Sequence, residues 1–64
     1  MSQKSMILEF IRDYGYITPA MAYAEFGCLR LAARVSELRQ EGHPITTEMQ
    51  QTGPKRYAAY RLAS

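Results

Sequence analysis

Cysteine, histidine and tryptophan are nearly missing from this sequence, which has one cysteine, one histidine and no tryptophan. A single cysteine cannot form a disulfide within the chain, and it cannot assemble a structural zinc site with only one histidine. The fold must therefore depend on the packing of helices and strands, or on a partner.

Long apolar segments are missing too. Residues 14–26 carry only one charge, but they include Gly15 and Pro19 and are too short to span a membrane. The first four residues, Met-Ser-Gln-Lys, have no apolar core of the kind found in secretory signals. We therefore expect a cytoplasmic protein.

What is present fits one small globular unit. The chain has 64 residues and 7.3 kDa, with 47% hydrophobic and 22% charged residues, so we expect a single domain over residues 1–64 with its core in about 5–62.

The net charge of +2 is unevenly distributed along the chain. Residues 1–29 carry two cations and three carboxylates, a balance of −1, whereas residues 30–64 carry six cations and three carboxylates, a balance of +3. The basic half is a mild indication of a polyanionic partner.

Helical periodicity predicts three helices, at about 5–14, 20–26 and 29–41. Their predicted boundaries are Ser5 and Gly15 for the first helix, Thr18, Pro19 and Gly27 for the second, and Gly42 and Pro44 after the third. In the third helix the apolar positions are Leu31, Val35 and Leu38, and the opposite side is predicted to carry Arg30, Ala33, Arg34 and Glu37.

After Pro44 the pattern changes to alternation. Residues 45–50 and 56–62 are predicted strands, and the turn-forming residues 51–55 between them predict a β-hairpin. A hairpin alone is unstable, so it must pack on the helices, with residues 16–17 as a candidate third strand. The predicted fold class is α+β, and the order of helix, stub, helix, tight turn, helix and hairpin is that of a winged helix-turn-helix.

The sequence also resembles a family of small helix-turn-helix domains common in phages and prophages. The resemblance extends from about residue 5 to 62 and is most specific in the segments RLAARVSELRQEGHPI (30–45) and KRYAAYRL (55–62). It implies a winged helix domain that binds double-stranded DNA in a bacterial host cell, in transcription regulation or DNA recombination, as a small regulator or an excisionase-like architectural factor.

In such a domain the third helix enters the major groove. Arg30 and Arg34 are the first candidates, because arginine binds guanine or phosphate there; for Arg34 the alternative is an ion pair with Glu37 or Glu41. Ala33 is a candidate for contact with a thymine methyl group, and Glu37 for contact with cytosine. Ser36 and Gln40, at the edge of the same face, are candidates for phosphate or base contacts.

The hairpin and the second helix supply the remaining candidates. Lys55 and Arg56 are expected on the phosphate backbone or in the minor groove, unless they only protect a strand edge from aggregation. Thr18, at the start of the second helix, is expected to offer backbone N–H groups to a phosphate. Stacking of Tyr57 and Tyr60 on single-stranded bases is a weaker alternative.

No enzyme activity, metal or small-molecule cofactor is expected. His43 has no acidic or serine partner at a diagnostic spacing, and Cys28 is more typical of a small buried side chain. Few base-contacting residues imply weak binding by one copy, hence a homodimer or cooperative assembly on DNA. The alternative function is a winged-helix protein-interaction module, such as a phage-encoded inhibitor or adaptor of a host protein.

Overall fold

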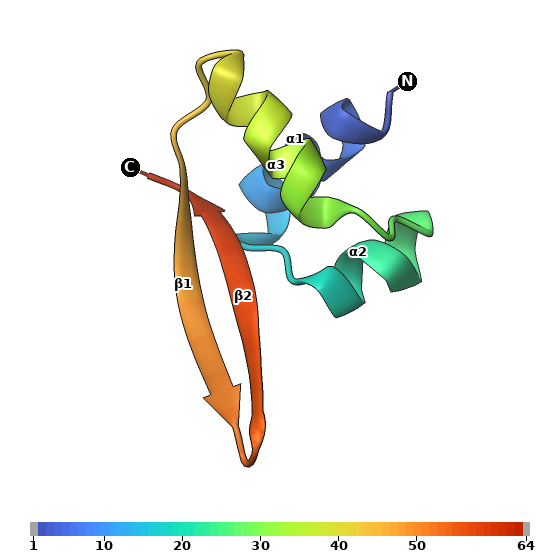
Figure 1. Ribbon diagram of the computed structural model, residues 1–64. Helices are drawn as coiled ribbons and strands as arrows, with labels where there is room; N and C mark the ends of the chain where they lie inside the picture. Colours follow the sequence, from blue (N-terminus) through green and yellow to red (C-terminus); the bar gives the residue numbers. More distant parts are fainter. Residues whose placement is uncertain (1, 64) are drawn as a thin grey trace.

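The computed structural model describes residues 2–63. It contains three helices followed by an antiparallel two-stranded sheet: α1 (Gln3–Tyr14), α2 (Pro19–Phe26), α3 (Leu31–Gln40), β1 (Ile45–Thr52) and β2 (Lys55–Leu62). In Figure 1 the helices form one body, with α1 behind α3, and the hairpin reaches away from them. The predicted α+β arrangement of a winged helix-turn-helix is confirmed.

The first helix begins earlier than predicted. Ser2, not Ser5, is the N-cap, because the Ser2 Oγ accepts a hydrogen bond from the Ser5 backbone N–H at 3.2 Å. The added turn is held by Gln3, whose side chain donates to the Phe26 carbonyl, and by an ion pair of Lys4 with Glu41. These contacts come from α2 and α3, so the sequence of α1 alone does not predict them.

The second helix is as predicted. Thr18 caps it, with its Oγ1 accepting from the Met21 N–H at 3.2 Å, and Pro19 occupies the first turn. Gly27 ends the helix at φ +63°, a left-handed conformation that a glycine adopts without steric cost.

The third helix is shorter than the predicted 29–41. Leu29 is 82% exposed outside the helix, and Arg30 is the N-cap with φ −127° and ψ 53°. The Arg30 side chain makes no capping hydrogen bond to any described residue. At the other end Glu41 is the C-cap. Residues 29 and 30, which the periodicity had assigned to the helix, belong to the short turn after Gly27.

The hairpin is longer than predicted and its turn is tighter. Thr52 pairs with Lys55, so that Gly53 and Pro54 alone form the turn instead of residues 51–55. Gly53 has φ +61°, which a two-residue turn of this kind requires and most residues avoid.

The candidate third strand is a single β-bridge. Ile17 exchanges two backbone hydrogen bonds of 2.9 Å with Tyr60, which ties β2 to the segment between α1 and α2.

All five elements and both loops around α2 contribute to one core. Its buried members are Ile7, Leu8, Ile11, Ile17, Ala22, Cys28, Leu31, Val35, Leu38, Ile45 and Tyr60. Cys28 is 3% exposed, so it packs as a small apolar side chain as expected. Among residues 2–63, no helix is long and apolar enough to cross a membrane.

Candidate nucleic-acid interface

The middle of the exposed side of α3 is made of small or uncharged side chains. Leu31, Val35 and Leu38 are buried against the core. The solvent side of the helix carries Ala33, Ser36 and Gln40, three of the predicted contact residues, and all three are exposed. The backbone of α3 can therefore come close to a bound ligand, because little side-chain volume stands in front of it.

Arg34 lies at the edge of this side and is already engaged. Its guanidinium is 3.2 Å from the Glu37 carboxylate, and its Nε is buried with no hydrogen-bond partner in residues 2–63. Next to it, Lys4 of α1 pairs with Glu41. This hydrogen bond raises the pKa of Lys4 and lowers the pKa of Glu41. Arg30, Arg34 and Glu37, which were predicted on one helix face, are thus separated. Arg34 and Glu37 pair with each other at the edge of the exposed side, and Arg30 lies in the turn before α3.

Arg30 stands in a different environment. It is exposed, directly precedes the first residue of α3, and lies within ion-pairing distance of no carboxylate that the structure describes. Its charge is therefore available to a ligand approaching the N-terminal end of the helix.

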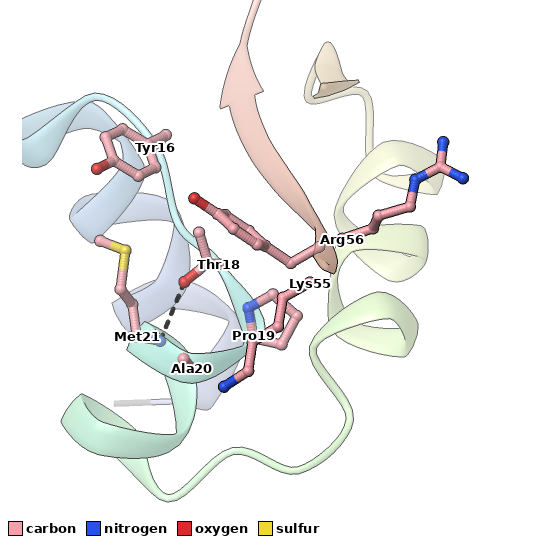
Figure 2. A pocket seen from close by; sticks show the side chains of 8 residues that line it. Tyr16, Thr18, Pro19, Ala20, Met21, Lys55 and Arg56 are labelled. Atoms are coloured by element: carbon pink, nitrogen blue, oxygen red, sulfur yellow. Dashed lines mark hydrogen bonds between the residues drawn. The ribbon is translucent and has the colours of Figure 1, made fainter. Parts of the chain in front are cut away.

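The hairpin and α2 enclose a cleft of about 610 Å³ that brings three predicted residues together. It is lined by Tyr16, Thr18, Pro19, Ala20, Met21, Lys55, Arg56 and Tyr57 (Figure 2). Figure 2 shows Lys55 beside Pro19 and Ala20 at the start of α2, and the Arg56 guanidinium pointing away from the cleft. Thr18 is 7% exposed and its hydroxyl is occupied as a cap, so its side chain offers little to a ligand in the cleft.

Tyr16, which lines the cleft, was not predicted as part of the nucleic-acid site. Tyr16 lies next to Tyr14, with ring centroids 5.3 Å apart, and this neighbour raises the pKa of Tyr16. On the other side of its ring is the Arg61 guanidinium, 5.9 Å from the centroid and 3.3 Å from the Glu48 carboxylate. No periodic signal marks such a cluster, because it joins a loop to both strands.

Tyr57 and Tyr60 differ in exposure. Tyr60 is 9% exposed and packs in the core, whereas Tyr57 is 38% exposed. The two rings therefore do not form the stacking platform that the weaker alternative of single-strand binding requires.

Arg39 fixes the base of the hairpin and was not singled out from the sequence. Its Nε donates to the Ile45 carbonyl at 2.8 Å, and its Nη2 donates to the Thr47 Oγ1 at 2.7 Å. These two bonds join the last turn of α3 to the first residues of β1. They set the angle between the helix and the hairpin.

The ion pairs divide the cations of the basic half, residues 30–64, into paired and unpaired ones. Glu37, Glu41 and Glu48 are each paired with a cation. Of the cations described there, Arg30, Lys55 and Arg56 have neither a carboxylate partner nor a side-chain hydrogen bond. Unpaired charge is thus concentrated at the start of α3 and at the turn end of the hairpin.

Comparison with known proteins agrees with this geometry. A search of curated proteins and of solved structures finds no match. The family model described as winged helix-turn-helix domain matches residues 2–64, nearly the whole chain. Domains of this family are in general DNA-binding and typically not enzymes. The chain belongs to the winged helix-turn-helix domain family.

Proposed function

We propose that this protein binds double-stranded DNA with sequence selectivity, with α3 in the major groove and the hairpin along the neighbouring backbone. The observation that carries this proposal is the presence of three exposed and unpaired cations at the start of α3, Arg30, and next to the turn of the hairpin, Lys55 and Arg56. Phosphates on both sides of a major groove would meet these charges while the helix enters between them.

Base recognition would come from few residues. Gln40 can form a bidentate hydrogen bond with adenine, Ala33 can contact a thymine methyl group, and Ser36 can bond to several bases. Glu37, held by Arg34, would be released for a cytosine only at the cost of its ion pair. We therefore expect modest selectivity and a minor contribution from Arg34.

Lys55 and the α2 backbone near Thr18 face the same cleft and would hold one phosphate strand between them. One copy has few contacts, so useful affinity requires two copies on adjacent sites, as a homodimer or a cooperative assembly. A small phage-type transcriptional regulator or an excisionase-like architectural factor would fit these properties.

The test is binding to a random duplex DNA pool across a salt series. If three phosphates are neutralised, the logarithm of the affinity should fall with the logarithm of salt at a slope of about −2.7. Lys55→Ala/Arg56→Ala should reduce the steepness by about 1.8, and Arg30→Ala by about 0.9. Arg34→Ala is the matched control, since this arginine is paired, and it should leave the slope nearly unchanged.

Salt-independent binding, or equal loss of slope in all variants, would contradict the proposal. Absence of binding at low salt would reject DNA as the ligand of the isolated chain. In either case circular dichroism on each variant separates loss of binding from loss of fold.

A further inference from the structure

A second surface of the molecule, between α1 and α2, has the opposite chemistry from the proposed DNA-binding side. Here a groove of about 330 Å³ is lined by Phe10, Tyr14, Met21, Ala24 and Glu25. It lies on neither α3 nor the hairpin, and none of the residues proposed to bind DNA contributes to its lining.

The aromatic wall of this groove is preformed. Phe10 stacks on Tyr14 with ring centroids 5.3 Å apart and meets Phe26 of α2 edge-on at 5.8 Å. Phe10 is partly buried and packs against the core, whereas Tyr14 is 60% exposed. A ligand would therefore find a fixed aromatic surface that costs little ordering on binding.

One carboxylate lines the groove, and two more stand next to its lining residues in the sequence. Glu25 lines the groove from α2, and on α1 Glu9 and Asp13 directly precede Phe10 and Tyr14, on the neighbouring side of the helix. All three carboxylates are exposed, and no cation of residues 2–63 lies within ion-pairing distance of them.

This contrasts with the rest of residues 2–63, where every acidic side chain is paired. Glu37, Glu41 and Glu48 each have a cationic partner. Moreover, Glu9 and Asp13 stand four residues apart on one helix, an arrangement in which like charges repel and destabilise the helix slightly. Glu9 and Asp13 thus form no ion pair that would stabilise the fold, and a cationic ligand would reduce the repulsion between them.

We propose that this groove docks a cationic, partly apolar segment of another protein: an apolar side chain against Phe10 and Tyr14, with arginines or lysines on both sides. The charge excludes nucleic acid from this surface, and an arginine would both pair with the carboxylates and stack on the exposed Tyr14 ring. An amphipathic helix with a basic border has this chemistry.

The groove and the exposed face of α3 can be occupied together. The buried side of α3 is the one that packs toward α1 and the core, so its exposed residues face away from α1, which lies behind α3 in Figure 1. The protein would then bring a partner bound in the groove to its DNA site, and the partner would not compete with the DNA. Met21 lines both the groove and the cleft beside the hairpin, but none of the residues proposed to contact DNA lines the groove, so the inference does not depend on the proposed DNA binding.

The experiment measures binding of a fluorescent synthetic helical peptide with leucines on one face bordered by arginines. A matched peptide has glutamate in place of every arginine. The full chain should bind the arginine peptide and not the glutamate peptide. Glu9→Gln/Asp13→Asn/Glu25→Gln, which keeps side-chain shape, should weaken binding about tenfold. Glu48→Gln, on the hairpin, is the control and should bind as the wild type does.

Tyr14→Leu provides a second readout, because it removes the ring without placing a polar group in the groove. It should also weaken the arginine peptide. Unchanged affinity of the triple variant, equal binding of both peptides, or no binding of the arginine peptide would overturn the proposal. So would a dimer of the chain that the triple variant dissociates, since a second copy would then be the occupant.

Discussion

At the scale of single residues, an ion-pair partner decides whether an arginine is available to a ligand, more than its position along the helix does. Arg30 and Arg34 are four residues apart and were predicted to act alike, yet one is exposed in a turn and the other is bonded to Glu37. The difference arises because α3 begins after Arg30, which leaves Arg34 beside the seam with α1. Cations that stabilise the fold are thereby distinguished from those available to a ligand.

The ion pair of Lys4 with Glu41 makes stability depend on pH. Glu41 has its pKa lowered from an ordinary value of 4.5, so the pair stabilises the fold above that value, and this is lost as pH falls through the lowered folded pKa. Lys4 has its pKa raised from 10.5, so at the alkaline end the contribution is complete below that value and is lost as pH rises through the folded pKa.

Glu41→Gln should accordingly be slightly less stable than wild type at neutral pH and equal to it once Glu41 is protonated. Urea unfolding at the two pH values measures this difference. Added salt should shrink it at neutral pH, because both groups are exposed. A difference that persists at low pH would mean that the side chain acts through packing instead.

Arg39→Met should destabilise the fold by about 2 kcal/mol, because it removes two charged hydrogen bonds to β1 and leaves the Ile45 carbonyl without its donor. Arg56→Met is the matched control, since Arg56 has no partner in the described chain, and should change stability by less than about 0.5 kcal/mol. Chemical denaturation of both variants tests this. Similar losses would show that the contacts of Arg39 are not what holds the hairpin.

At the scale of helices and strands, α2 has the strongest local signals. Thr18→Ala should lower stability by about 1 kcal/mol by removing the cap of the Met21 N–H. Thr18→Ser keeps the hydroxyl and should recover most of that loss. Thermal melts of the three proteins measure it. If serine were as destabilising as alanine, burial of the threonine methyl group, rather than the cap, would be the cause.

Elements with local signals were predictable, and those defined by contacts between elements were not. Proline, threonine and glycine around α2 act through their own backbone, so both ends of that helix were predicted correctly. The starts of α1 and α3 were placed wrongly. The first is extended by partners on other helices, and the second is shortened by a turn that periodicity does not reveal.

The same division applies to the candidate site. The sequence placed Lys55 and Arg56 in the hairpin and near its turn, because alternation and turn residues are local. It missed Tyr16 and Arg39, whose roles depend on segments brought together only by folding. For Arg34 the sequence offered both a DNA contact and an ion pair with Glu37 or Glu41, and the structure shows the pair with Glu37.

At the scale of the whole molecule, one small core holds everything in place. Ile7 is fully buried in a cluster that includes residues of every element. A chain of this size has a stability of about 3–10 kcal/mol, and Ile7→Ala should remove about 3 kcal/mol. We expect helical circular dichroism and DNA binding to be lost together on warming, although Ile7 is not one of the proposed DNA-binding residues. Loss of one signal before the other would show that the hairpin and helices unfold separately.

The attachment of the hairpin has a mechanical consequence. Ile17 and Arg39 hold it at its base, near Tyr60 and Ile45, whereas Lys55 is five residues farther along β2, about 17 Å away. The hairpin is therefore attached to the core near its base, and a rotation of about 10° there would move the turn by roughly 3 Å over that length. In the proposed complex, the distance between the hairpin turn and α3 would have to match the DNA groove. Moving the hairpin to fit a wider or narrower groove would cost free energy, so sequences that differ only in groove width would bind with different affinity without a base contact there.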